Sequence, residues 1–248
     1  MDKKDWQRRG AGHRERLRER FLENGLGAFT DAEILEVLFG FGTPRQDCKD
    51  RARAALARFG SLPAVLEAAP EELRRVPGVG PKNVFALRFV HAVARKFLER
   101  RIEGKTYVHA AADVAAYLGH ALADRKRERF LALFLDARHA ILGVETLFEG
   151  TLTASAVYPR EVVKAALARH AAALVFAHNH PSGNTDPSPE DIRLTRNLYL
   201  AARLLDIRVL DHLVVGEAGR FTSFAEAGLM ADIRAACEEM LARAMPAG

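Results

Sequence analysis

An apolar run that ends in two histidines constrains this chain more than any other stretch of its sequence. Residues 172–176 read Ala-Ala-Leu-Val-Phe, which predicts a short buried strand. Side chains two apart on a strand point to the same face of the sheet. His178 and His180 therefore leave the end of this strand on one side, close enough together to share a metal ion.

The residues after the histidines predict an ordered turn and then the start of a helix. Residues 181–187 contain two Pro, one Gly and polar Asn and Asp, which is typical of a turn. Ser188 fits the N-cap of a helix and Pro189 its first position. Asp191 then falls in the first helical turn, where the loop can fold it back towards the histidines. Two neutral imidazoles and one carboxylate, with a fourth position left for water, are typical of a catalytic zinc site.

A simpler interpretation of the same residues needs no metal. Ser188 and Asp191 also fit a helix capping box, and a histidine pair at a strand end is commonly hydrogen-bonded structure. However, a polar His-Asn-His segment directly after five apolar residues is costly unless it has a function. We therefore predict a metal site formed by His178, His180 and Asp191.

The order His-x-His-Pro, followed by Ser-x-x-Asp, resembles the pattern of the JAMM (MPN+) zinc metalloproteases. Every element of it is present, as His178, His180, Pro181, Ser188 and Asp191. The resemblance implies an α/β domain of the JAMM/MPN type, similar to cytidine deaminases, and one zinc ion per chain. It also implies that Ser188 helps to stabilise the oxyanion of a tetrahedral intermediate.

Further segments make the chain look like the RadC family in particular, over nearly its whole length. They are His-Asn-His-Pro-Ser-Gly at 178–183, Tyr-Pro-Arg-Glu at 158–161 and Leu-Asp-His at 210–212. In JAMM proteins a glutamate at the start of an early strand accepts a proton from the attacking water. Carried over by position, this role points to Glu128, with Glu149 as the main alternative.

His212 and Asp211 form a second pair of polar residues on a strand that looks buried. A carboxylate often orients a histidine that binds a metal. We nevertheless interpret the pair as a structural contact near the site.

Residues 77–82 read Pro-Gly-Val-Gly-Pro-Lys and look like the turn of a helix-hairpin-helix motif. Gly78 and Gly80 would let the backbone approach a phosphate, the following helix would offer amide donors, and Lys82 would add charge. Residues 1–104 hold 21 Lys+Arg and 15 Asp+Glu, a net charge of +6, whereas residues 105–248 hold 16 and 17, a net of −1. We therefore expect sequence-independent DNA contact through the N-terminal half. A solvated helical surface with a tight αα-turn is the alternative.

The length of the chain and the positions of its helical and charged segments predict two domains. The chain has 248 residues, enough for one large domain or two small ones. Helical patterns fill the first part, and the charged segment 99–105 is interpreted as a linker. We predict an all-helical domain over 1–104 and a metal-binding domain over 105–248. Residues 32–42 repeat the outline of the hairpin segment, which predicts a second, degenerate hairpin at Gly40-Phe41-Gly42.

Strand and helix patterns alternate in the second domain. Strands are predicted at 129–136, 140–148, 172–176 and 208–215, and helices at 111–123, 159–170, from 189 to about 206, and 231–244. This alternation predicts an α/β sandwich, with a mixed sheet and helices on both faces.

The sequence also indicates a compartment. It has no apolar run long enough to cross a bilayer and no signal-peptide core, so we expect no membrane contact. Its two cysteines, Cys48 and Cys237, lie far apart without partners at metal-binding spacing. They favour a reducing compartment, and hence a cytoplasmic protein.

Two functions are consistent with these features. The first is a zinc-dependent metallohydrolase of the JAMM type that cleaves a peptide or isopeptide bond. The second is a DNA repair or recombination factor, whose helical part binds DNA and whose metal domain is structural or acts on nucleic acid. A single zinc with a glutamate base favours peptide chemistry, because many nucleases use two metals. The sequence identifies neither the substrate nor the oligomeric state.

Overall fold

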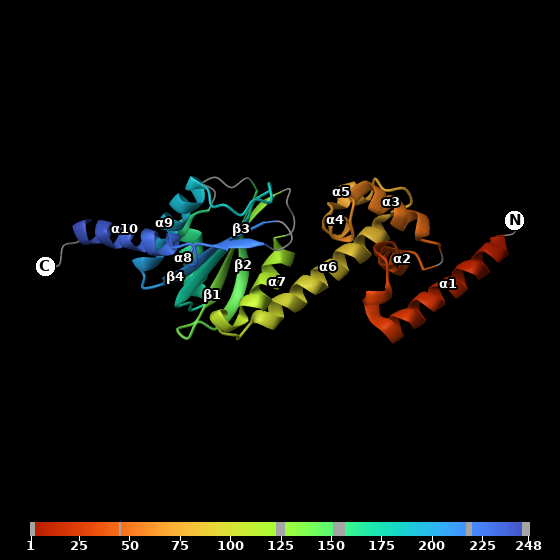
Figure 1. Cartoon of the computed structure of the whole chain (residues 1–248), viewed down its shortest axis with the longest axis horizontal. Helices are drawn as coiled ribbons and strands as arrows, with labels where there is room; N and C mark the ends of the chain where they lie inside the picture. Colours follow the sequence, from red (N-terminus) through yellow and green to blue (C-terminus); the bar gives the residue numbers. More distant parts are fainter. Residues whose placement is uncertain (1–2, 45, 123–126, 151–156, 217–219, 245–248) are drawn as a thin grey trace. The chain divides into compact units, whose positions relative to one another are not determined.

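The computed structural model describes residues 3–44, 46–122, 127–150, 157–216 and 220–244, with only the backbone for residues 3–11 and 111. The chain forms two compact units, residues 1–94 and 95–248 (Figure 1). Each is described by itself. Within the described residues, no helix is long and apolar enough to span a bilayer.

The first unit is entirely helical in its described part. Thr30 caps the second helix with a complete capping box, Ser61 caps the fourth, and Gly60 ends the third in the left-handed conformation. Leu35, Phe39 and other fully buried side chains form its core. The elements are α1 (Lys3–Asn24), η1 (Gly25–Ala28), α2 (Asp31–Gly42), α3 (Lys49–Phe59), α4 (Leu62–Glu67), α5 (Pro70–Leu73) and the start of α6 (Pro81–Ile102).

The predicted second hairpin in this unit is wrong. Gly40 and Gly42 lie within α2, and neither has a positive φ, whereas Gly78 between α5 and α6 turns the chain with φ 77°. A Cβ at Gly42 would lie 2.6 Å from the Lys82 carbonyl oxygen. Gly42 therefore allows the end of α2 to approach the start of α6 closely, which explains a glycine there without a turn.

The predicted linker over 99–105 is also wrong. Residues 99–102 are the last turn of α6, and Ile102 is fully buried in the core of the second unit. The charged residues do not break the helix, because Lys96 with Glu99 and Arg100 with Glu103 form i,i+3 pairs along it. The helix stops just before Gly104, which has φ 74°. The chain divides into its two units at 94/95, within α6, and the domain bounds of 1–104 and 105–248 stay a prediction.

The second unit is built on a mixed five-stranded sheet in the order β2-β1-β3-β4-β5. β1 pairs antiparallel with β2 and β3, β3 pairs parallel with β4, and β4 pairs antiparallel with β5. The elements are η2 (Tyr107–Ala110), α7 (Ala111–Ala121), β1 (Glu128–Leu135), β2 (Ile141–Gly150), α8 (Pro159–Ala168), β3 (Ala173–Asn179), α9 (Pro189–Arg203), β4 (Arg208–Val215), β5 (Phe221–Ser223) and α10 (Leu229–Ala244).

Helices cover both faces of this sheet, as the sequence predicts (Figure 1). Alternate residues of β1 belong to different cores: Phe130 and Phe134 pack with α8, α9 and α10, and Leu131 and Leu133 pack with α7 and the end of α6. Every residue of the central strand β3 is buried, which is why its first half reads as a continuous apolar run. The strands and helices predicted in the second domain are all present.

Candidate metal centre

The two histidines lie at the carboxyl end of β3. His178 is within the strand, opposite Phe130 of β1, and His180 follows the last strand residue. Their rings point to the same side, with 3.0 Å between the two Nε2 atoms. Gly183, with φ 76°, then turns the chain, and its amide donates to the His180 carbonyl oxygen at 2.9 Å. The strand end and the turn together bring both imidazoles to one point.

Asp191 reaches the same point from the first turn of α9. Its Oδ1 lies 3.1 Å from His178 Nε2 and its Oδ2 lies 3.1 Å from His180 Nε2. Ser188 also forms a full capping box with it, because the Ser188 amide and hydroxyl donate to Oδ2 at 2.8 and 2.7 Å and the Asp191 amide donates to Ser188 Oγ. The capping interpretation and the metal interpretation are thus compatible. The box occupies Oδ2 and leaves Oδ1 for a metal.

The three side chains fit a zinc ion by donor type and by spacing. Nitrogen or oxygen atoms about 2.0–2.1 Å from a tetrahedral zinc lie about 3.3–3.4 Å from one another. The observed separations of 3.0–3.1 Å are close to this value. The group is also enclosed: the side chain of His178 is fully buried, that of Asp191 is 3% exposed, and that of His180, at 15%, opens the site to the surface. A buried carboxylate between neutral imidazoles leaves one negative charge, which a divalent cation would compensate.

Hydrogen bonds set the ionisation of these groups. Burial alone raises the pKa of Asp191, but hydrogen bonds with His178, His180 and Ser188 outweigh it, so the net pKa is well below its ordinary value. The hydrogen bond to Asp191 raises the pKa of His180, and the charge of Glu128 adds a smaller contribution. The carboxylate is therefore ionised at neutral pH, as a metal ligand must be.

A hydrogen bond on the far side of His180 fixes which of its nitrogens is free. Its Nδ1 lies 3.1 Å from the carbonyl oxygen of Asn184. A carbonyl oxygen only accepts, so Nδ1 carries a proton. When a metal replaces the proton that Nε2 donates to Asp191, the lone pair of Nε2 faces the site.

His212 on β4 contacts the site through its ring. Its Nε2 lies 2.9 Å from His178 Nδ1, and its Nδ1 lies 2.6 Å from the hydroxyl of Thr195 on α9. Burial first, and then the neighbouring His178, hold the pKa of His212 well below its ordinary value. The ring is therefore neutral at physiological pH.

Asp211 does not orient the ring of His212. Its carboxylate accepts from the backbone amides of His212 and Ala225 at 2.7 and 2.9 Å, and from the Ser223 hydroxyl at 2.7 Å. Adjacent residues on a strand point to opposite faces, so the two side chains of this pair separate. The alternative in which Asp211 orients a ligating histidine therefore does not hold, and these contacts agree with the favoured interpretation of the pair as structural. Asp211 ties β4 to β5 and to the residues that follow it.

Glu128 begins β1 on the side of the sheet that carries the histidines. It lies two residues before Phe130, whose ring stacks on His178 with 6.4 Å between centroids. Phe130 pairs with His178, so the same antiparallel register places Glu128 opposite His180. The contribution of Glu128 to the pKa of His180 agrees with this position.

Asn179, between the two histidines, clamps the backbone around Glu128. Its Oδ1 accepts from the Arg129 amide at 2.8 Å, and its Nδ2 donates to the Arg127 carbonyl oxygen at 3.0 Å. The ladder between β1 and β3 ends at Phe130 and His178, so this side chain continues the pairing beyond the last backbone pair. The middle residue of the His-Asn-His segment thus holds Glu128 in register with the site.

The alternative base, Glu149, faces the other way. It pairs with Arg129, and directly opposed residues of neighbouring strands share a face. It also forms ion pairs with Arg127 and Arg129 at 3.4 and 3.3 Å. Because Arg129 and Glu128 point to opposite faces, Glu149 lies on the side of the sheet away from the histidines.

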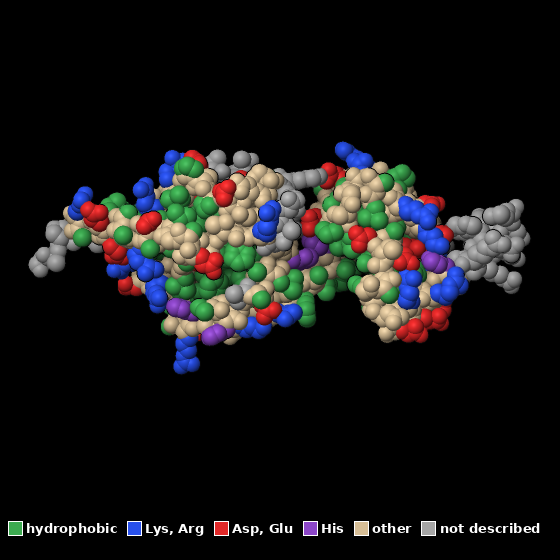
Figure 2. Space-filling model, in the orientation of Figure 1, with side chains coloured by type: hydrophobic (Ala, Val, Ile, Leu, Met, Phe, Trp, Pro, Cys, Tyr) green, Lys and Arg blue, Asp and Glu red, His purple; other side chains and the backbone are tan. Residues whose placement is uncertain are grey.

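The residues predicted to contact nucleic acid lie in the first unit. The Gly80 amide donates to Asn83 Oδ1 at 3.1 Å, and the open side of Gly78 faces the Arg51 side chain. The Gly80 amide is therefore already occupied and is not a free donor for phosphate. Lys82 is exposed at the start of α6. The face of this unit in view mixes acidic and basic side chains rather than forming one basic patch (Figure 2).

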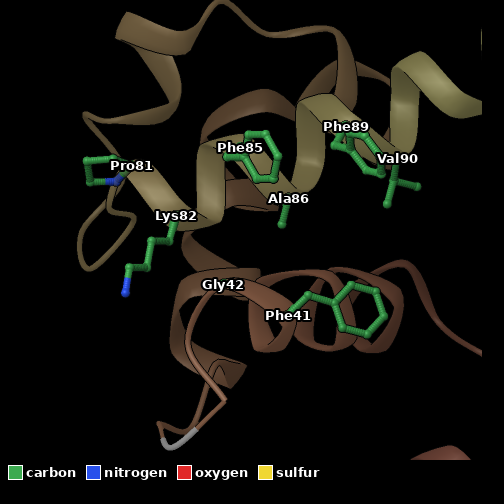
Figure 3. Close-up of a pocket in the computed structure, with 8 residues that line it drawn as sticks. All are labelled: Phe41, Gly42, Pro81, Lys82, Phe85, Ala86, Phe89 and Val90. Atoms are coloured by element: carbon green, nitrogen blue, oxygen red, sulfur yellow. The ribbon is translucent and has the colours of Figure 1, made fainter.

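A groove opens beside Lys82. Its volume is about 500 Å³, and its lining comes from the end of α2 and the first three turns of α6: Phe41, Gly42, Pro81, Lys82, Phe85, Ala86, Phe89 and Val90. Phe85 and Phe89 lie along α6 with Phe41 across the groove, and Lys82 extends from one end (Figure 3). The Phe85 and Phe89 rings stack with 5.6 Å between centroids and 21° between planes, and both are mostly exposed. This groove was not predicted from the sequence, although phenylalanines four apart on a helix share a face.

The roles of Thr195 and Asn179 were also not predicted from the sequence. Thr195 lies four residues after Asp191, one helical turn along the same face of α9. That spacing was a usable signal for Thr195. The partners of Asn179, in contrast, lie 50 and 52 residues away along the chain and follow only from the strand pairing.

Comparisons with known proteins agree with this architecture. A family model described as a RadC-like JAB domain matches residues 108–229, and a UPF0758 N-terminal model matches residues 9–85. The UPF0758 protein of Burkholderia mallei (strain SAVP1) is 46% identical over 215 residues, which are 87% of this chain and 77% of that protein. The UPF0758 protein of Stenotrophomonas maltophilia (strain R551-3) is 44% identical over 217 residues, 87% of this chain and 92% of that protein. The chain therefore belongs to the UPF0758 family, and its residues 108–229 form a RadC-like JAB domain.

Proposed function

We propose that the second unit is a zinc-dependent hydrolase that cleaves a peptide or isopeptide bond. The observation that carries the proposal is the convergence of His178 Nε2, His180 Nε2 and an Asp191 carboxylate oxygen within 4.8 Å of one another, with Glu128 on the same side of the sheet. Two imidazoles, one carboxylate and a position open to the surface are the donor set of catalytic zinc sites.

Each residue then has a role. His178, His180 and Asp191 hold the metal, which supplies Lewis acidity that acidifies water and polarises a carbonyl. Glu128 accepts a proton from the attacking water and passes it to the leaving amine. Ser188 donates its hydroxyl hydrogen to Asp191 in this structure. To stabilise an oxyanion, this hydroxyl must rotate towards the substrate while its amide keeps the capping box closed.

Metal binding is tested first. The chelator-treated, zinc-reloaded protein should contain about one zinc per chain by elemental analysis, since one group of three ligands is present in the described residues. The double variant His178→Ala/His180→Ala should contain none. Full zinc content in that variant would refute the ligand assignment.

Hydrolysis is tested separately from metal content. The reloaded protein is incubated with a peptide library and with lysine-linked isopeptides, and mass spectrometry identifies new termini. Glu128→Gln keeps the shape of the side chain but removes its basicity, so zinc content should stay while cleavage falls about 100-fold or more. Glu149→Gln is the matched control and should cleave normally, because Glu149 faces away from the site. Equal loss in both variants would contradict Glu128 as the base.

A second candidate function is the binding of single-stranded DNA by the first unit. The observation that favours it is the groove, where the exposed Phe85 and Phe89 rings lie beside Lys82. Bases stack on exposed aromatic rings without regard to sequence, and a cation at the end of the groove attracts the phosphate backbone. The proposal depends on this groove rather than on the amide of Gly80, which is occupied.

Fluorescence anisotropy with a labelled oligothymidine tests it on the full chain. Binding should weaken steeply between low and physiological salt, because phosphate contacts release counterions. Phe85→Ala should cost about 1–3 kcal/mol of binding, the usual value of one stacked base. Val93→Ala, an exposed apolar position on α6 outside the groove lining, is the control and should have no effect. Equal effects of the two variants, or no binding at low salt, would exclude the groove.

A further inference from the structure

Three buried side chains continue outward from the metal centre in a single hydrogen-bonded row. His178 Nδ1 lies 2.9 Å from His212 Nε2, and His212 Nδ1 lies 2.6 Å from Thr195 Oγ1. The Thr195 hydroxyl in turn donates to the Asp191 carbonyl oxygen at 2.6 Å. All three side chains belong to residues with no exposed surface. The row joins β3, β4 and α9, so it starts and ends at metal-ligand residues.

The direction of this row follows from its last member. A hydroxyl has one hydrogen, and the Asp191 carbonyl oxygen can only accept it. Thr195 Oγ1 must therefore accept from His212, which places the His212 proton on Nδ1. A neutral His212 then has its lone pair on Nε2, so His178 must donate from Nδ1. With zinc bound, the lone pair of His178 is on Nε2, the atom that faces Asp191 and His180.

The opposite direction would disable the site. If Thr195 donated to His212, His212 would donate to His178 Nδ1, and the His178 proton would lie on Nε2. A protonated nitrogen cannot bind a metal. The Nδ1 atom of His180 is fixed by the carbonyl oxygen of Asn184. Among the described contacts, the Nδ1 atom of His178 has only His212 as a partner.

The surroundings of His212 hold its ring in this row. Phe224, Phe130 and Phe176 lie 4.9, 5.4 and 6.0 Å from it between ring centroids. Both nitrogens of the His212 ring have hydrogen-bond partners inside the protein, so the ring needs no water molecule as a partner. A buried polar row in an apolar shell is costly unless every member is satisfied, which favours a single direction of donation.

We propose that Thr195 and His212 are positioning residues that hold His178 in the Nδ1-protonated tautomer and so prepare its Nε2 for zinc. The proposal rests on the metal site of the proposed function, but not on its hydrolytic chemistry. It predicts that polarity, not bulk, matters at both positions. Groups that donate towards Thr195 and accept from His178 preserve the site, and apolar groups of similar shape do not.

Matched variants separate polarity from shape. Thr195→Val keeps the branched shape and removes the hydroxyl, whereas Thr195→Ser keeps the hydroxyl and removes a methyl group. His212→Phe removes both ring nitrogens, whereas His212→Gln offers an amide oxygen towards His178 and an amide nitrogen towards Thr195. Changes around metal-binding histidines typically weaken metal affinity 10- to 100-fold. Thr195→Val and His212→Phe should show about that loss, and Thr195→Ser should stay close to the unmodified protein.

Two measurements on the full chain test the proposal without a substrate. Competition with a chromophoric chelator gives the zinc Kd, and NMR of the histidine rings in the zinc-loaded protein shows whether His178 Nδ1 keeps a proton that it donates to His212. We expect a slowly exchanging Nδ1 proton on His178 that exchanges faster in Thr195→Val, while urea unfolding shows that this variant still folds. The absence of a protected Nδ1 proton on His178 in the zinc-loaded protein would overturn the proposal, as would an unchanged exchange rate and zinc Kd in Thr195→Val. Failure of peptide cleavage with these results intact would refute the hydrolase and leave the row of donors standing.

Discussion

Replacing Gly216 by alanine should weaken the metal site without altering any ligand. Gly216 follows β4, and a Cβ there would lie 2.5 Å from the Gly183 carbonyl oxygen and 2.5 Å from Thr185 Cγ2. The methyl group of Thr185 can rotate away, but the carbonyl oxygen belongs to the backbone of the loop. Ordinary contact begins at 3.4 Å, so the loop must move by about 0.9 Å. The neighbouring residue Asn184 accepts a hydrogen bond from His180 through its carbonyl oxygen, so this displacement reaches a proposed metal ligand.

Overpacking of this kind costs about 1–3 kcal/mol of folding free energy. Displacement of a group that orients a ligand weakens metal affinity about 10- to 100-fold. Urea unfolding of the metal-free protein measures the first effect and chelator competition the second. Gly143→Ala on β2 is the matched control, because its Cβ would meet no atom within 4 Å. If Gly216→Ala matches this control in both measurements, the loop is not held by its contact with Gly216 and the reasoning fails.

Other substitutions test the remaining contacts. Gly42→Ala should destabilise the first unit by about 1–3 kcal/mol, because its Cβ would lie 2.6–2.8 Å from backbone atoms of α6. Gly40→Ala on the same helix meets no atom within 4 Å and should stabilise it by about 0.5–1 kcal/mol, and urea unfolding distinguishes the two signs. Glu33→Gln should cost about 1 kcal/mol at pH 7. Hydrogen bonds from the Thr30 amide and then from Arg20 lower the folded-state pKa of Glu33 from 4.5 to about 2, so this cost should disappear as the pH falls through that range; a cost that persists at pH 2 contradicts it. Asp191→Asn should lower the zinc content, measured by elemental analysis, while circular dichroism shows that the chain stays folded. Normal zinc content in this variant would exclude Asp191 as a ligand.

Local signals made much of the second unit predictable. The start of α9 follows from Ser188 and Pro189, whose capping and φ preferences act within one turn. The end of β3 follows from the change from apolar residues to the polar turn. His178 and His180 share a side because a strand alternates with a period of two. Each of these inferences depends on neighbours within a few residues.

Contacts between distant segments were not predictable in the same way. Glu128 faces the site because of the register between β1 and β3, and nothing near Glu128 in the sequence specifies that register. The resemblance supplied the residue, and the strand pairing supplies the reason. His212 was associated with Asp211 because they are adjacent, yet its ring partner is 34 residues away. The end of α6 was interpreted as a linker because it is rich in charged residues. The helix continues there because its last residue, Ile102, is buried against residues far away in the sequence.

The capping box of α9 offers a way to observe the metal centre without a substrate or a label. The Ser188 amide donates to Asp191 Oδ2, and the Asp191 amide donates to Ser188 Oγ. The other oxygen of the same carboxylate, Oδ1, faces the histidines. A cation that immobilises this carboxylate also slows the opening of the first turn, so these two amides should exchange their hydrogens with deuterated solvent more slowly. Their exchange rates would thus report, residue by residue, how fully the centre is occupied.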